Sequence, residues 1–286
     1  EVSDTYTMIS AFLKKTFDNK QINLVRPLQV YVRDAYGKDK EKEKMGAIQE
    51  IQQYRDSCNV DESSVSPVAA IAKMETYLAY VCILQKRFSF GKSGRGVFSK
   101  ASKVEVSFKW VDSYRHTKIE QSMDIGLEKC AIMFNLGALM SLHAVKLSEQ
   151  DEEGLKAACK LFRESAGVFE YMAQNSSNDT IQFVQNMDIQ KDSCKLLANL
   201  MLAQAQACFA EMAIRKKMKA KLISTLAIGT SELFQQCVGS IDMTAALKSW
   251  IEKGEYNFRA HCLHQQEYYT AIAHYYESQR VATLAE

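Results

Sequence analysis

Proline and glycine are scarce in this chain, and the shortage of both favours long helices. Its 286 residues include two prolines and twelve glycines. Because these two residue types most often end regular structure, few tight turns are expected. The 47% apolar share is ordinary for a globular protein and excludes wholesale disorder. A chain of this length can therefore bury a substantial core.

Paired cysteines are absent as well. The eight cysteines include no CxxC pair, and most lie within apolar helical patterns. In a chain this long, that distribution is typical of reduced, buried thiols in a cytosolic protein and argues against a disulfide framework. His261, Cys262 and His264 lie close together, but a metal site needs more ligands than these. We interpret them as ordinary helix residues and expect no metal.

A long uninterrupted apolar segment is also missing. Residues 1–20 contain none, so no secretory signal is expected. The most apolar stretch, Ile125–Val145, is interrupted by Glu128 and Lys129, and it falls short of the roughly 20 apolar residues that a membrane span needs. We expect a soluble, cytoplasmic protein that meets a membrane only from the surface.

The recognised catalytic signatures do not occur either. The sequence contains no P-loop, GxGxxG, HExxH, GxSxG or kinase-type motif. Glu128, Asn135 and His143 lie in an apolar helical stretch, and nothing nearby completes a catalytic set with them. We interpret all three as buried polar groups that are satisfied by partners. We expect no enzyme, no cofactor and no small-molecule substrate.

Charge of one sign does not dominate the chain. The formal net charge is +2, so the molecule as a whole is neither a polycation nor a polyanion. Attraction to phosphate or to acidic partners must therefore come from local patches. We expect no nucleic-acid partner.

What the chain does contain is helical periodicity along most of its length. Asn23 precedes a helix that Gly37 ends, and Pro67 suits the first turn of another helix. The last region, Met243–Glu286, is either one long helix or a pair broken at Gly254. We predict helices over residues 24–36, from the charge run at 39–44 to 58, 67–87, 125–147, 152–172, 187–216, 219–238 and 243–286.

Two short segments carry strand signals. Tyr6–Lys14 mixes β-branched and aromatic residues, and Val104–Trp110 alternates apolar and polar residues. Together they predict a small amino-terminal sheet, with loops at 61–66, 91–103 and 175–180. The helices suggest hairpins with arms of about 20 residues and no strict repeat period. We predict a mainly α fold, an irregular solenoid of tetratricopeptide-like hairpins in a single domain.

The stretch Cys208–Leu226 is the clearest candidate for a binding site. Phe209 shares a helix face with Gln206 and Lys216, so it is not expected to point fully inward. After the turn, Leu222 and Leu226 share one face, and Ile223, Ala227 and Phe234 define a neighbouring face. If only one face packs inward, the other leaves an apolar groove that suits an acidic amphipathic helix. The alternative is that both faces are core and the neighbouring basic residues are merely solvated. Those basic residues are Arg215, Lys216, Lys217, Lys219 and Lys221.

Several segments, taken in order, resemble the BRO domain, the amino-terminal domain of ALIX-type proteins. The stretch IGLEKCAIMFNLGALMSLHA from Ile125 is similar to the central helix of that family. The ordered set covers nearly the whole chain. The other matching segments are LVRPLQVYVRDAYG from Leu24, YLAYVCILQKRFSF from Tyr77, VEVSFKW from Val104, EEGLKAACKLFRESAGVFEYM from Glu152 and MLAQAQACFAEMAIRKKMKAKLISTL from Met201.

The resemblance implies a curved, boomerang-shaped helical solenoid that acts as a scaffold. BRO domains bind the carboxy-terminal amphipathic helix of Snf-seven-type ESCRT-III subunits in multivesicular-body sorting and membrane remodelling at endosomes. The matching groove positions are Phe209, Leu222 and Leu226. The polar rim maps onto Glu152, Lys156 and Lys160, with Glu152 standing where ALIX-type sequences carry the shorter aspartate.

Two departures from the family pattern limit what the resemblance implies. Between Trp110 and Glu128 the chain is shorter than ALIX, so partner contacts of the phenylalanine-bearing loop of that protein are not carried over. BRO domains also continue past the residue that matches Glu286, so we expect a domain truncated at its carboxy end.

A membrane-surface or adhesion module is the alternative function. It would use two basic stretches to bind anionic lipid, at endosomes or at the plasma membrane, and some protozoan members of the family are described as adhesins. Such binding is expected to weaken steeply with salt. The residues of this basic patch are Lys92, Arg95, Lys100, Lys103, Arg215, Lys216, Lys217 and Lys219.

Overall fold

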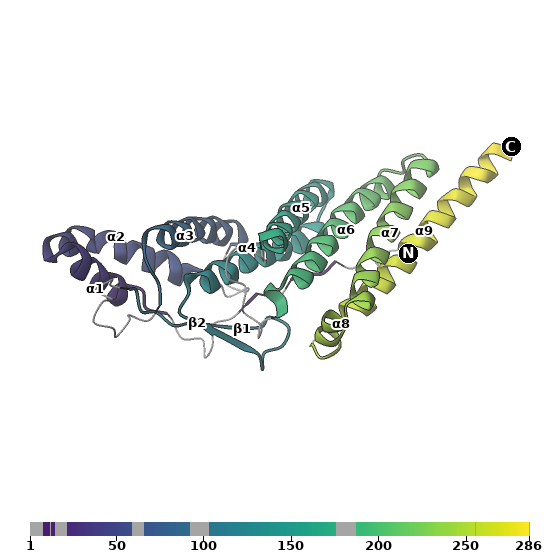
Figure 1. Ribbon diagram of the computed structural model, residues 1–286. Helices are drawn as coiled ribbons and strands as arrows, with labels where there is room; N and C mark the ends of the chain where they lie inside the picture. Colours follow the sequence, from purple (N-terminus) through teal and green to yellow (C-terminus); the bar gives the residue numbers. More distant parts are fainter. Residues whose placement is uncertain are drawn as a thin grey trace. The chain divides into compact units, whose positions relative to one another are not determined.

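Helices make up most of the chain in a computed structural model (Figure 1). The structure describes residues 8–11, 13–14, 22–58, 66–91, 103–175, 187–254 and 256–285. The elements are α1 (Val25–Tyr36), α2 (Lys38–Ser57), α3 (Pro67–Arg87), β1 (Phe108–Val111), β2 (Ile119–Ser122), α4 (Ile125–Ser148), α5 (Glu152–Asn175), the short 3-10 helix η2 (Met187–Ile189), α6 (Lys191–Arg215), α7 (Ala220–Met243), α8 (Ala245–Glu252) and α9 (Phe258–Ala285).

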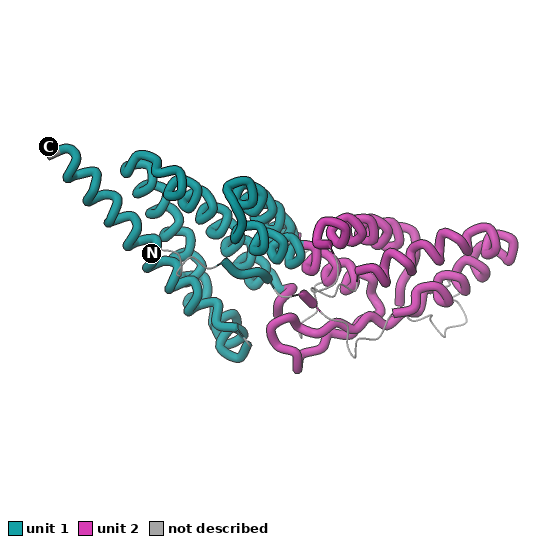
Figure 2. Tube along the Cα trace, turned by 180° about the vertical axis from the view of Figure 1, so that it is seen from behind, with its two compact units in different colours: residues 1–12, 137–174, 190–286 teal, residues 13–136, 175–189 magenta. Residues whose placement is uncertain are grey.

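The chain forms two compact units, each of which is described by itself (Figure 2). One unit comprises residues 13–136 and 175–189. The other comprises residues 1–12, 137–174 and 190–286, and the boundary between them falls within α4. The single domain expected from the sequence stays a prediction.

The first unit carries α1 to α3 and the small sheet. Gly37, with a φ of 88°, separates α1 from α2 in a backbone conformation that glycine adopts readily. Strands β1 and β2 are antiparallel, with Phe108 opposite Ser122. The period-two prediction is correct for burial, because Val104, Val106, Phe108 and Trp110 are all buried. Only the end of that segment pairs as a strand, however, and its partner is β2, which the sequence did not predict.

The strand predicted at Tyr6–Lys14 is wrong for the residues that the structure describes. Residues 8–11 and 13–14 are in no strand. Their backbone N–H groups donate instead to helix side chains: Ile9 to Gln204 Oε1, Ala11 to Ser141 Oγ and Lys14 to Asn135 Oδ1. Buried backbone donors require partners, and polar side chains of helices supply them here in place of a neighbouring strand.

The second unit is built from long helices joined by short turns. Asp151 caps the start of α5 by accepting a hydrogen bond from the N–H of Gly154 at 2.9 Å. Helix α7 packs on α9, where Ser231 Oγ donates to the carbonyl of Gln266 at 3.1 Å. The predicted break near Gly254 is confirmed, since α8 ends at Glu252 and α9 begins at Phe258. The other predicted helices are also confirmed, with small shifts at their ends.

Close packing in this unit depends on Gly137 in α4. A Cβ at this position would lie 3.0 Å from Cζ of Phe169, so the aromatic ring fits only because the side chain is absent. Beside it, Ser165 Oγ donates to the carbonyl of Gly137 at 2.7 Å. The long α4 helix is thus held by α5 through direct contact with its backbone.

Three helices, α3, α4 and α6, are long and apolar enough to cross a membrane by length and composition alone. The sequence-based statement that no segment reaches this limit is therefore wrong. The share of the apolar window that is buried inside the protein is 67% for α4 and for α6, and 28% for α3. Burial accounts for the composition of α4 and α6, since a helix surrounded by neighbours is apolar on most sides. The predicted fold class, a mainly α arrangement of helical hairpins with a small sheet, is confirmed.

Candidate docking surface

The outer face of α6 exposes two large apolar side chains. Leu202 is 44% exposed and Phe209 is 43% exposed, although most of the helix around them is buried. The two residues are seven positions apart, which places them on the same face of the helix. Sequence reasoning identified Phe209 but missed Leu202, which the seven-residue spacing could have revealed.

Helix α7 presents a second apolar face beside the first. Leu222 is 44% exposed and Leu226 is half-buried, whereas Ile223, Ala227 and Phe234 are buried. Of the two faces that the sequence left open, the one carrying Ile223 is therefore core and the one carrying Leu222 points outward. We call Phe209, Leu222 and Leu226 the α6/α7 strip.

The register between α6 and α7 places these side chains together. The two helices are antiparallel neighbours joined by a turn of a few residues, in which Lys217 has a φ of 50°. A Cβ at Gly229 of α7 would lie 3.9 Å from Nε2 of Gln206 on α6. Phe209 follows Gln206 by three residues and Leu226 precedes Gly229 by three, so these two side chains stand at the same level.

The predicted rim residues lie at the start of α5. Glu152 Oε1 binds Lys216 Nζ of α6 at 2.5 Å and Lys156 Nζ at 3.2 Å. Hydrogen bonds from Lys216 and then Lys156 lower the pKa of the Glu152 carboxyl. Lys160 lies one turn further on and is 3.7 Å from Glu164. The structure thus brings Glu152 and Lys156 into one charged cluster with Lys216, next to the end of the strip.

The predicted basic patch is only partly described. Lys92, Arg95 and Lys100 lie outside the described residues, and Lys103 borders a cavity of about 470 Å³ that Arg26, Tyr31 and Asp34 also line.

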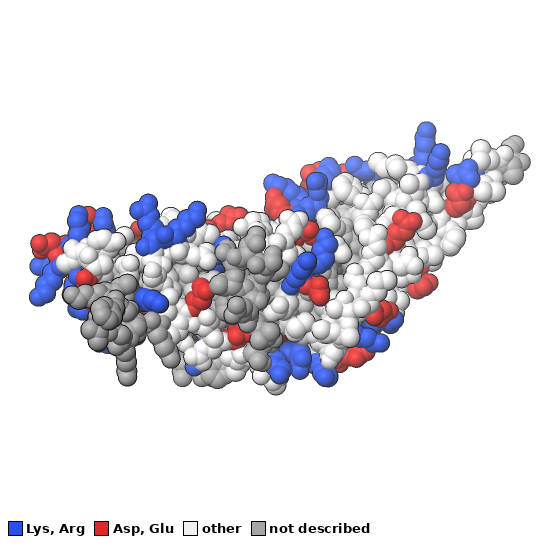
Figure 3. All heavy atoms as spheres, viewed as in Figure 1, with Lys and Arg blue, Asp and Glu red and all other residues white. Residues whose placement is uncertain are grey.

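In the second basic stretch, Arg215 binds Glu211 at 3.0 Å and Lys216 binds Glu152 at 2.5 Å. Lys217 and Lys219 are exposed. Figure 3 shows basic and acidic side chains intermixed on the face in view.

Glu128 is a structural residue, as the sequence indicated. Its carboxylate accepts hydrogen bonds from Arg55 Nε at 3.2 Å, Tyr77 Oη at 3.0 Å and Trp110 Nε1 at 2.8 Å. Burial, and then the negative charge of Glu128, raise the pKa of Tyr77 well above its usual value. Asn135 is also satisfied, because its side chain binds both the N–H and the carbonyl of Lys14.

His143 does not follow the same pattern. Its Nδ1 atom is buried and has no hydrogen-bond partner among the described residues, so the prediction of a satisfied group is wrong for this residue. Burial lowers its pKa. Burial also lowers the pKa of His261 to about 4, so that imidazole is neutral near pH 7. The described residues contain no cluster of three or more potential metal ligands, and the eight cysteines are free thiols.

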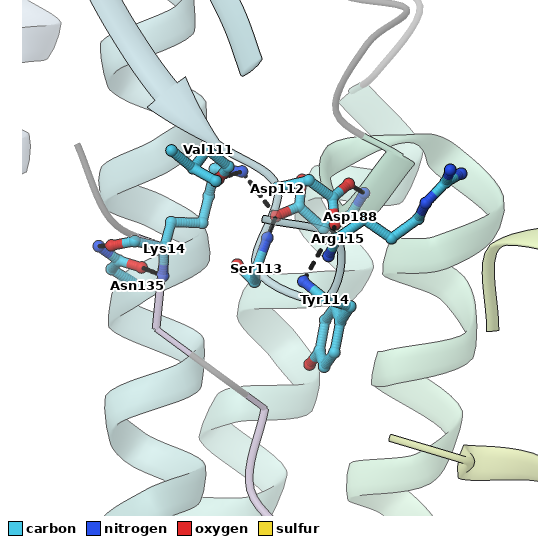
Figure 4. Close-up of polar contacts among 8 residues, drawn as sticks. All are labelled: Lys14, Val111, Asp112, Ser113, Tyr114, Arg115, Asn135 and Asp188. Atoms are coloured by element: carbon cyan, nitrogen blue, oxygen red, sulfur yellow. Dashed lines mark hydrogen bonds and ion pairs between the residues drawn. The ribbon is translucent and has the colours of Figure 1, made fainter. Parts of the chain in front are cut away.

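A buried charged cluster that the sequence did not reveal lies around Asp188 (Figure 4). Lys14 Nζ donates to Asp188 Oδ2 at 2.6 Å and to the carbonyl of Val111 at 2.9 Å. Asp112 Oδ1 accepts from the backbone N–H groups of Tyr114 and Arg115, both at 3.0 Å. Burial and the nearby charge of Asp188 raise the pKa of Asp112. The cluster ties the amino-terminal segment to the end of β1 and to η2, which is a structural role.

The comparison with protein families decides which family this is. The family model described as "BRO1-like domain" matches residues 8–283. The chain belongs to the BRO1-like domain family. The resemblance inferred from the sequence is confirmed.

Curated relatives of this BRO1-like domain are sorting proteins. The vacuolar protein-sorting protein bro1 of Aspergillus fumigatus is 28% identical over 271 residues, which are 93% of this chain and 25% of the relative. The programmed cell death 6-interacting protein of Homo sapiens is 26% identical over 236 residues, 80% of this chain and 26% of the relative. The chain therefore spans about a quarter of the length of these relatives.

Solved structures show the same fold. A complex titled "ALIX BRO1 CHMP4C complex" has a TM-score of 0.79 at 23% identity, covering 98% of this chain and 75% of that chain. A structure titled "Structure basis for endosomal targeting by the Bro1 domain" has a TM-score of 0.77 at 18% identity, covering 98% of this chain and 72% of that chain.

Proposed function

We propose that this BRO1-like domain is a scaffold, not an enzyme, that binds the carboxy-terminal amphipathic helix of a Snf-seven-type ESCRT-III subunit. Its place of action is the endosomal membrane, to which the cytoplasmic protein is recruited for sorting and membrane remodelling. Two relatives support this: a vacuolar sorting protein and a solved ALIX BRO1 complex with CHMP4C.

The observation that carries the proposal is the exposure of Phe209 and Leu222 on neighbouring helices. Fully burying a side chain of this size contributes about 1.5–3 kcal/mol, so covering two half-exposed ones favours association. An amphipathic helix that lays its apolar face on the α6/α7 strip would supply that cover.

Charge at the edge of the strip favours an acidic ligand. Lys156, Lys160 and Lys216 lie on the α5 side, with side chains 39–79% exposed. Glu152 already binds two of these lysines. Carboxylates of a partner helix could share the lysines with Glu152, and each exposed pair of this kind contributes up to about 1 kcal/mol.

The test is a calorimetric titration with a synthetic peptide of the CHMP4C carboxy-terminal helix. Wild-type protein is expected to bind at micromolar strength. Phe209→Asp and Leu222→Asp should each weaken binding at least about 100-fold, because burying an unpaired carboxylate is costly. Ile228→Asp is the matched control, since Ile228 is 41% exposed but lies on a different face of α7 from Leu222. Wild-type affinity in both strip variants would refute the site.

The membrane or adhesion alternative is not favoured. The relatives named above are sorting proteins, and neither adhesion nor a plasma-membrane location has support among them. Two of the four described basic-patch residues, Arg215 and Lys216, are engaged in ion pairs. Sedimentation with neutral and anionic liposomes at two salt concentrations would detect lipid binding independently of the peptide.

A further inference from the structure

The apolar surface of α6 does not end at Phe209. Leu202 is as exposed as Phe209 and lies on the same helix face, two turns nearer the start of α6. Gln206 lies between the two and approaches Gly229 of α7. Leu202 is therefore continuous with the α6/α7 strip.

The helix register gives the length of the extended surface. Leu202 precedes Gln206 by four residues, which is about 6 Å along the axis, and Leu222 precedes Gly229 by seven residues, which is about 10 Å in the opposite sense of the chain. Because α6 and α7 are antiparallel, these distances add to about 16 Å. A ligand helix that covers both ends therefore needs about eleven residues, or three turns.

A cation stands opposite Leu202 on α5. Glu152 of α5 binds Lys216 and Glu170 of α5 binds Lys195, so the edge of α5 that runs beside α6 is fixed at two points. Arg163 lies seven residues from both Lys156 and Glu170, which places it on that same edge. Counting eleven residues back from Lys216 and seven on from Lys195 puts Arg163 level with residues 202–205 of α6.

Arg163 differs from the lysines at the other end of the strip. It is exposed and forms no ion pair with any residue that the structure describes, whereas Lys156 and Lys216 both bind Glu152. Its guanidinium is available to an incoming carboxylate and presents paired donors that suit one.

We propose that the docking surface extends from the α6/α7 strip to Leu202 and Arg163 and holds three turns of an acidic amphipathic helix. One further apolar side chain of the partner covers Leu202, and a carboxylate in the same part of the partner binds Arg163. The inference rests on the proposed function, because it names a second part of the same site.

The test uses the CHMP4C helix peptide and four variants in parallel titrations. Leu202→Asp should weaken binding at least tenfold, and Arg163→Glu at least fivefold. Ile228→Asp controls for an added surface carboxylate, and Lys248→Glu controls for a charge reversal away from the site. Circular dichroism melting curves confirm that all variants are folded, as expected for exposed positions.

Charge exchange then tests the contact with Arg163. In a set of peptides that each replace one acidic residue by lysine, one peptide should bind Arg163→Glu more tightly than it binds the wild type.

The outcomes separate the two proposals. If Phe209→Asp abolishes binding while Leu202→Asp and Arg163→Glu bind within twofold of the wild type, the extended surface is refuted and the proposed function stands. If Phe209→Asp also binds within twofold, the proposed function fails at this site, and the extension fails with it.

Discussion

Asp112 is the buried carboxyl whose ionisation should be visible in stability. Burial and the charge of Asp188 raise its pKa, so the folded protein holds the proton at pH values where the unfolded chain has released it. The stabilisation from that proton is complete below the ordinary aspartate pKa and is lost as the pH rises through the raised value. The free energy of unfolding of the wild type, relative to Asp112→Asn, should therefore fall across that window. Urea denaturation from pH 4 to pH 8 measures it, and parallel curves would contradict the assignment.

Glu128 tests whether the core of the first unit depends on one acceptor. Replacing it by leucine leaves the donors of Arg55, Tyr77 and Trp110 without the carboxylate that they share. Breaking a buried pair in this way costs about 3–5 kcal/mol. Glu128→Gln keeps an acceptor and should cost clearly less. Equal losses of unfolding free energy in chemical denaturation would show that the hydrogen bonds are unimportant.

At the residue scale, the sequence predicts that a polar group is buried but not which partner it has. Glu128 and Asn135 stood out because they interrupt an apolar helical pattern. Lys14 and Asp188 gave no such signal, since they lie 174 positions apart and neither interrupts a recognisable element. His143 shows the other limit, because its pattern predicted burial but not the lack of a partner.

At the element scale, Gly137 and Gly167 form a matched pair. Gly137→Ala would place a Cβ 3.0 Å from the ring of Phe169 and should destabilise the protein by about 1–3 kcal/mol. Gly167→Ala meets nothing within 4 Å on α5, so the better helix propensity of alanine should stabilise by about 0.5–1 kcal/mol. Thermal melting compares the two. A similar shift for both would mean that the contact with Phe169 is not tight.

Long helices could be predicted from the sequence, and short strands could not. Periodicity over 20 or more residues averages out local exceptions, which is why α2 to α7 appear within a few residues of their predicted ends. Strand β2 has four residues, IEQS, with one buried side chain, and its strand state comes from pairing with β1. Tyr6–Lys14 failed for the opposite reason. Its composition suits a strand, but its described part binds helix side chains.

At the scale of the whole molecule, pattern alone left the binding site undecided. Leu222 and Ile223 are adjacent, and their sequence context does not reveal which one faces the core. The resemblance to the BRO domain favoured Leu222 as the exposed residue, and the burial of Ile223 agrees with that orientation. Leu202 and Arg163 needed the structure, because only the spacing between α5, α6 and α7 shows that they lie side by side.

The most direct test of the docking surface is photo-crosslinking with the CHMP4C helix peptide. A benzophenone would replace one apolar anchor of the peptide at a time, and mass spectrometry would locate the attached residue. The account predicts that the crosslinks fall on α6 and α7 between residues 202 and 226, and that Phe209→Asp removes them. Efficient one-to-one crosslinking to any other part of the domain would contradict it.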